Sequence, residues 1–83
     1  MPKIEVTVIK LEDNSKVRTF RIPTGVLKVA SKFIPQNVAS GLKQQGIEVT
    51  DIIELAESGK VHGLVAEIDD HRKGERLVVS VSD

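Results

Sequence analysis

The stretch KIEVTVIKL, residues 3–11, decides the fold of this chain. Apolar residues occupy every second position of the stretch, and these are Ile4, Val6 and Val8. A period of two predicts a β-strand with one buried face. The polar residues 12–16 then predict a turn, and residues 17–22 predict a second strand with Phe20 and Ile22 on its apolar face. Together the two strands predict an antiparallel hairpin.

A similar pattern returns at the other end of the chain, from about Val61 onward. Residues facing the core are expected to be Leu64, Ala66 and Ile68, and the residues between them to face outward. A turn is predicted at residues 70–74. The last strand is predicted at 75–82, and its apolar positions are Leu77, Val79 and Val81.

The middle of the chain predicts helices instead of strands. One helix is expected from an N-cap at Thr24 to about Ile34, with Phe33 on its apolar stripe. A second is expected at 36–45, weakened by Gly41 and ended by Gly46. A third is expected to be capped by Thr50, to bury Ile52, Ile53, Leu55 and Ala56, and to end at Ser58-Gly59.

These elements predict one α+β domain over residues 1–83. Its core is a four-stranded antiparallel sheet made of the two hairpins, with two to three short helices on one face. The other face is mostly polar, as expected for a solvated sheet face. The pattern leaves the order of the strands open.

Composition excludes several classes of protein. Twelve basic and 12 acidic residues cancel, and Cys is absent from the 83 residues, which excludes disulfides and thiolate metal sites. A nucleic-acid binder usually carries a basic excess. The chain shows no signal-peptide pattern and no apolar run long enough for a membrane span, so we expect a cytoplasmic location and no membrane partner.

Three stretches resemble a known family. IPTGVLKVASKFIP at 22–35, GIEVTDII at 46–53 and the terminal hairpin at 59–81 are similar to the small C-terminal α+β domain of uncharacterised bacterial proteins that contain a SHOCT-like domain. The last turn, residues 70–74, is more basic here than in that pattern. The resemblance implies a regulatory role, but it brings no catalytic or cofactor residues.

Candidate chemical sites are weak throughout the sequence. His71 lies near Asp69, Asp70 and Glu67, but their spacing matches no metal-binding motif. The helix start at Thr24-Gly25 offers backbone N–H groups to an anion, but it has no glycine-rich loop. No nucleophile has a positioned base. We therefore expect no enzyme activity, no metal and no cofactor.

An interaction domain is the favoured function. Three apolar residues are expected on the polar face of the sheet, and they are Ile9, Val65 and Val78. Such a cluster, together with exposed strand edges, favours contact with a protein partner or a homodimer. The alternative is an accessory nucleic-acid-binding module whose phosphate contacts come from Arg18, Arg21, Arg72, Lys73 and Arg76.

Overall fold

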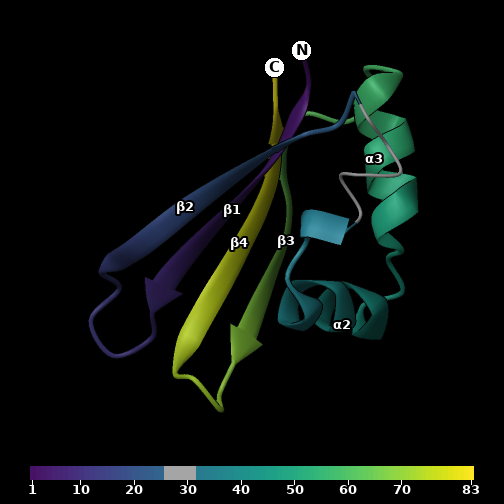
Figure 1. Ribbon diagram of the computed structural model, residues 1–83. Coiled ribbons are helices and arrows are strands. Elements are labelled where there is room, and N and C mark those ends of the chain that lie inside the picture. Colours follow the sequence, from purple (N-terminus) through teal and green to yellow (C-terminus); the bar gives the residue numbers. More distant parts are fainter. Residues whose placement is uncertain (26–31) are drawn as a thin grey trace.

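The computed structural model describes residues 1–25 and 32–83 of the chain. Four strands form one antiparallel sheet in the order β2-β1-β4-β3 (Figure 1). The strands are β1 (Lys3–Lys10), β2 (Lys16–Pro23), β3 (Gly63–Asp70) and β4 (Glu75–Ser82). In the described part of the chain between the two hairpins lie α2 (Gln36–Gln44) and α3 (Val49–Glu57), and Lys32 and Phe33 are also helical. The predicted α+β fold is confirmed.

The first and last strands form the centre of the sheet. Lys3 lies opposite Ser82, and the pairing continues without interruption to Lys10 opposite Glu75. This register brings the two ends of the chain together at one end of the sheet, as Figure 1 shows. It also joins the buried faces of the two hairpins, because Ile4, Val6 and Val8 lie opposite Val81, Val79 and Leu77.

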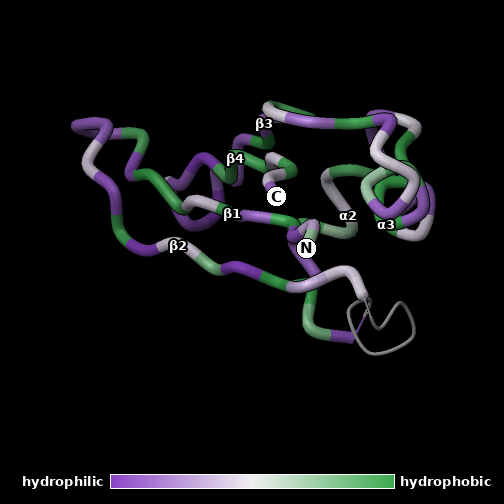
Figure 2. The backbone as a smooth tube through the Cα atoms, turned by 90° about the horizontal axis from the view of Figure 1, so that it is seen from above, coloured by the Kyte–Doolittle hydropathy of each residue, from purple (hydrophilic) through white to green (hydrophobic). Residues whose placement is uncertain are grey.

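Both helices cover the same face of the sheet. α2 packs beside β3, and α3 packs over β1 (Figure 1). Each helix buries one stripe against the strands, made of Val38, Leu42, Ile52, Ile53 and Ala56. In Figure 2, green and purple segments alternate along the strands, which is the period-two pattern that separates the buried face from the polar face.

The two helices end in the same way. Gly46 follows α2 with a φ of 78°, and Gly59 follows α3 with a φ of 72°. After α2, the N–H of Ile47 donates to the carbonyl of Leu42; after α3, that of Lys60 donates to Leu55. This is the Schellman arrangement, which requires a left-handed residue after the helix. The predicted helix ends are confirmed, and α2 continues through Gly41 without a break.

The starts of the helices differ from the expectation. Helix α3 begins at Val49, so its N-cap is Glu48 and Thr50 lies inside the first turn. The helix predicted from Thr24 to Ile34 falls mostly on residues 26–31, outside the described residues. The buried hydroxyl of Thr24 instead lies 3.1 Å from the carbonyl oxygen of Pro2 and 2.7 Å from Oε1 of Glu57. It therefore ties the end of β2 to the N-terminus and to α3.

Three residues expected in the core are exposed. Phe33 is 66% exposed and Leu55 is 40% exposed. Leu64 is 62% exposed because β3 changes register against β4 between Leu64 and Ala66. Such a bulge inserts one extra residue, which moves the residues before it to the other face. Val65 consequently packs against the core, where the sequence pattern placed Leu64.

Candidate interaction surface

The face of the sheet that points away from α2 and α3, here called the open face, carries two of the three apolar residues expected there. Ile9 lies opposite Arg76, and Val78 lies two residues further along β4, so the two are diagonal neighbours. Both are half-buried. Val65 packs against the core instead. The bulge thus exchanges Val65 for Leu64 on this face, because Leu64 lies opposite Ser80 and is 62% exposed, while Ile9 and Val78 remain as expected.

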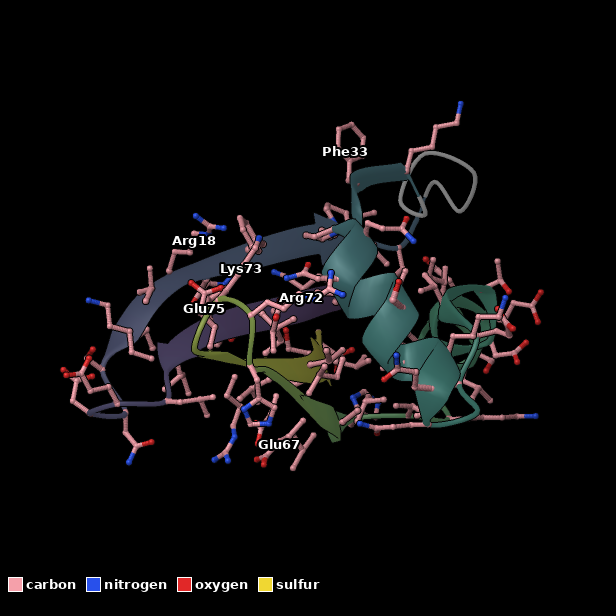
Figure 3. The ribbon with its side chains drawn as sticks, turned by 90° about the horizontal axis from the view of Figure 1, so that it is seen from below. Arg18, Phe33, Glu67, Arg72, Lys73 and Glu75 are labelled. Atoms are coloured by element: carbon pink, nitrogen blue, oxygen red, sulfur yellow. The ribbon has the colours of Figure 1, made fainter. Side chains whose placement is uncertain are left out.

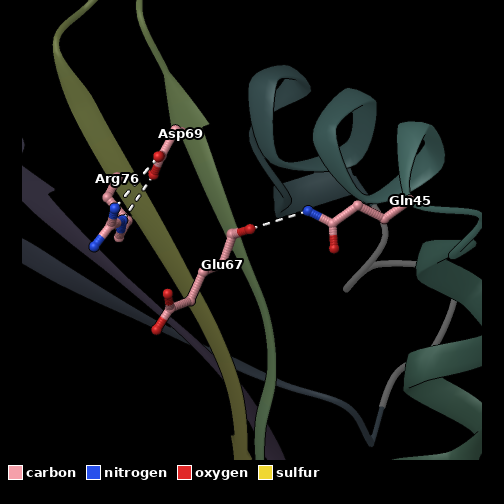
Figure 4. A network of polar contacts seen from close by, with 4 residues as sticks. All are labelled: Gln45, Glu67, Asp69 and Arg76. Carbon is pink, nitrogen blue, oxygen red and sulfur yellow. Dashed lines mark hydrogen bonds and ion pairs between the residues drawn. The ribbon is translucent and has the colours of Figure 1, made fainter.

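Cross-strand polar pairs surround this apolar pair. Nε of Arg21 donates to Oε2 of Glu5 at 3.1 Å. Nε of Arg76 donates to Oδ1 of Asp69 at 2.7 Å (Figure 4). The second pair lowers the pKa of Asp69 and raises that of Arg76, chiefly through their hydrogen bond. Two of the five candidate phosphate-binding residues are therefore already paired with carboxylates.

The other three basic candidates lie elsewhere. The guanidinium of Arg18 sits over the ring of Phe20, 4.9 Å from its centroid, and its opposite residue on β1 is the core residue Val8. Arg72 and Lys73 are in the second turn, where their backbone N–H groups lie 3.2 and 3.4 Å from Oδ1 of Asp70. The structure therefore does not gather the five basic residues into one patch.

Strand β3, at one edge of the sheet, is partly closed by the chain itself. Nε2 of Gln45 donates to the backbone carbonyl of Glu67 at 2.9 Å (Figure 4). α2 packs beside the same strand, and Nδ2 of Asn37 lies 3.4 Å from Oδ2 of Asp70. Both features protect an edge against pairing with a foreign strand.

Strand β2, at the other edge, has β1 as its only strand neighbour in the described chain. The N–H of Thr24 donates to the carbonyl of Pro2, which makes this an inward, hydrogen-bonded position. Because such positions alternate in an antiparallel pair, the backbone groups of Thr19 and Arg21 point away from β1. The outer edge of β2 therefore offers two N–H and two carbonyl groups at these residues.

An apolar depression of about 300 Å³ lies at the end of this edge. Its apolar walls come from Phe20, Ile22, Pro23, Phe33 and Pro35. Figure 3 shows Phe33 and Arg18 projecting on the same side of the molecule, away from Glu67. The sequence pattern missed this site because the helical spacing assigned Phe33 to the core.

Candidate metal ligands are scattered over the described residues. Within residues 1–25 and 32–83, no three His, Cys, Asp or Glu side chains gather closely enough to hold a metal ion. His62 lies 3.9 Å from a carboxylate oxygen of Asp83, and both side chains are more than half exposed. No helix in this part of the chain has the length and apolarity to cross a membrane.

The described residues define a small α+β domain with a four-stranded sheet, one face of which carries both helices, and with β2 and β3 as the edge strands. The model of the family described as YvlB-like protein, C-terminal domain, matches residues 3–82, so the chain belongs to this family. The resemblance to a C-terminal domain is thereby confirmed, but the family is the YvlB-like one and not specifically a SHOCT-like one. No curated protein and no solved structure matches the chain.

Proposed function

We propose that this chain is a non-enzymatic protein-interaction domain with a regulatory role. One observation carries the proposal: β2 is an edge strand whose outer backbone groups have no strand partner in the described chain. Proteins usually protect such edges, because unpaired N–H and carbonyl groups act as a template for another strand. Gln45 and α2 protect β3, whereas within residues 1–25 and 32–83 no other strand or helix pairs with the outer edge of β2.

The family description also supports the proposal. It defines the domain as the C-terminal part of a YvlB-like protein. Both ends of the domain lie at the same end of the sheet, so a connection there leaves the two hairpin turns and the outer edge of β2 accessible (Figure 1).

A different protein is favoured over a second copy as the partner. The charged residues of β2 are all basic, namely Lys16, Arg18 and Arg21. Two copies joined through β2 would place these like charges close together, which is unfavourable. On the open face, the apolar residues Ile9, Leu64 and Val78 offer only a small apolar area, whereas a stable interface buries about 800 Å² on each partner. We therefore expect a monomer in light scattering; a dimer that persists on dilution would revise this choice.

The nucleic-acid alternative rests on fewer residues than the sequence suggested. Arg21 and Arg76 are engaged by Glu5 and Asp69, which leaves Arg18, Arg72 and Lys73. Affinity for duplex DNA measured at two salt concentrations separates this alternative, because phosphate contacts weaken steeply as salt is raised. Strong, salt-sensitive binding would favour it over the protein-interaction proposal.

The interaction proposal itself is tested by capture and crosslinking. The immobilised chain is incubated with an extract of its host cell, and lysine-reactive crosslinks are then located by mass spectrometry. Crosslinks to Lys16 are expected, because this residue lies on β2. Crosslinks to Lys43 on the last turn of α2, or no specific capture, would contradict the assignment of the contact surface.

A further inference from the structure

We infer that β2 accepts an acidic, extended segment of another protein as a fifth strand of the sheet, and that an apolar side chain of this segment enters the depression between Phe20 and Phe33. This inference rests on the proposed function and adds to it the chemistry of the partner. Addition of a strand to an exposed edge is a common mode of peptide recognition, in which backbone hydrogen bonds supply affinity and side-chain pockets supply specificity.

The backbone of β2 sets the length of the added strand. Thr19 and Arg21 direct their N–H and carbonyl groups away from β1, as the alternation from the Thr24–Pro2 hydrogen bond requires. The next outward position is Pro23, which has no N–H to donate. Toward the first turn, the register of β2 shifts where Val8 and Ile9 meet Arg18 and Lys16. The usable edge is therefore short and centred on Thr19 and Arg21.

The charge of the edge selects the partner. β2 carries Lys16, Arg18 and Arg21 and no acidic residue. Of these, Arg21 is paired with Glu5, and in the described part of the chain no ion pair engages Lys16 or Arg18. Carboxylates on the incoming strand would balance these charges, whereas a basic strand would be repelled.

A second copy is a poor source of the added strand. β3 holds Glu67, Asp69 and Asp70 and no basic residue, so its charge alone would suit the β2 edge of another copy. However, the carbonyl of Glu67 already accepts from Gln45, and the carboxylate of Asp69 is bound by Arg76. Pairing through the outer edge of β3 would break the Gln45 contact, and Arg76 already balances the charge of Asp69. The acidic strand is thus expected from another protein.

The depression beside β2 supplies the apolar anchor. Phe33 is 66% exposed and lines the depression together with Phe20, Ile22, Pro23 and Pro35, and a contiguous apolar surface of this kind, unlike a single exposed ring, is typical of a binding site. Phe20 is half-buried and lies beneath the guanidinium of Arg18. The volume of about 300 Å³ is at the lower limit for a small-ligand pocket, so it suits one side chain better than a whole cofactor.

The test uses a display library of short random peptides selected against the intact chain. We expect the selected peptides to be enriched in Asp and Glu and to share one large apolar residue. One selected peptide is then synthesised with a fluorophore, and its affinity is measured by anisotropy. Peptides enriched in Lys and Arg would overturn the inference.

Variants of Thr19 isolate the backbone contact. Thr19→Pro removes the outward N–H, and we expect it to weaken peptide binding about ten-fold, the effect of one hydrogen bond at the upper end of its usual range. Thr19→Ala keeps the N–H and serves as the matched control, with affinity expected near that of the unmodified chain. Equal binding by Thr19→Pro and Thr19→Ala would overturn strand addition.

Hydrogen exchange provides a readout that needs no variant. In the free chain, the amides of Thr19 and Arg21 are expected to exchange quickly, and those of Phe20 and Ile22 slowly. Bound peptide should slow exchange at Thr19 and Arg21 specifically. Phe33→Ala and Arg18→Glu should each weaken binding several-fold, the former through the anchor and the latter through charge.

The outcomes distinguish a failure of strand addition at β2 from a failure of the interaction function. If peptides bind but protect the open face or the helices instead, strand addition at β2 is wrong while the interaction function stands. If neither the library nor the host-cell extract yields a binder, the interaction function itself is contradicted.

Discussion

A Cβ atom added to Gly41 in α2 would lie 2.9 Å from Cδ1 of Ile68 in β3, and closer still to Cγ2. The backbone of α2 at Gly41 therefore lies too close to Ile68 in the edge strand to leave room for a side chain. Its role is steric, because the residue lies inside a regular helix and has no positive φ. The sequence pattern predicted only that Gly41 lowers the helix propensity of this segment. In the structure, the missing side chain of Gly41 allows α2 to pack against Ile68 of β3.

Gly41→Ala is expected to destabilise the domain although alanine favours helices. The helical gain of about 1 kcal/mol is outweighed by overpacking against Ile68, so we expect a net loss of about 1–2 kcal/mol in the free energy of unfolding. Urea denaturation measures this loss. Ser40→Ala, at an exposed neighbouring position, is the control and should be neutral or stabilising.

A double-mutant cycle checks the cause of this effect. Ile68→Ala removes the atoms that the new methyl group would meet, so the combined variant should be less destabilised than the sum of the two single changes. Strict additivity would show that Gly41→Ala acts through something other than Ile68.

Thr24→Val tests the buried hydroxyl that joins three segments. Valine has a similar shape but cannot donate to Glu57 or Pro2, so we expect a loss of about 1 kcal/mol in thermal or urea unfolding. Thr24→Ser retains the hydroxyl but loses the buried methyl group, so its own loss reports packing and not the hydrogen bond. A Thr24→Val variant as stable as the unmodified chain would refute a contribution from the hydroxyl.

The positive φ of Gly46 should determine which substitutions this position tolerates. Its φ is 78° and no atom lies within 4 Å of an added Cβ, so the cost of a side chain is conformational and not steric. We expect Gly46→Ala to cost about 1 kcal/mol and Gly46→Asn less, because Asn adopts left-handed geometry more readily. Equal stability of all three proteins would contradict the Schellman assignment.

Stability is expected to fall at acid pH. The pKa of Asp69 is lowered by its hydrogen bond with Arg76, that of Asp70 chiefly by Asn37, and that of Asp13 chiefly by Ser15. A carboxyl whose pKa is lower in the folded state stabilises above its unfolded pKa, about 3.9 for Asp, and this contribution disappears as pH falls through the folded value. The urea midpoint should therefore be level from about pH 7 to 5 and decline below about pH 4.

Asp69→Asn provides the control for this pH dependence. The variant keeps the shape of the side chain but loses the charge that Arg76 binds. Its stability should decline less steeply with acid than that of the unmodified chain. An identical slope would show that the Asp69–Arg76 pair contributes nothing to the pH response.

The limits of sequence reasoning are clearest in β3. The alternation of Leu64, Ala66 and Ile68 predicted three inward residues, and the last two are buried. The bulge that turns Leu64 outward depends on how β3 meets β4, and the two strands fix it only when they pair. The loss of Val65 from the open face follows from the same irregularity.

The edge beside Phe33 shows the same limit at the candidate site. The basic residues of β2 could be read from the sequence, but the position of β2 at an edge could not, because pairing between the first and last strands is a long-range contact. The exposure of Phe33 likewise could not be predicted from its helical spacing, which placed the side chain in the core.

The sequence by itself determined the two hairpins, the helical middle and the glycines that end both helices. These features follow from period-two patterns, turn residues and left-handed backbone positions, each of which depends on a few neighbouring residues. The tertiary structure alone decided the strand order, the bulge in β3, the closed edge at Gln45 and the open edge at Thr19 and Arg21. Each of these depends on contacts between segments far apart in the chain. The pattern of neighbouring residues does not determine which distant segments pair.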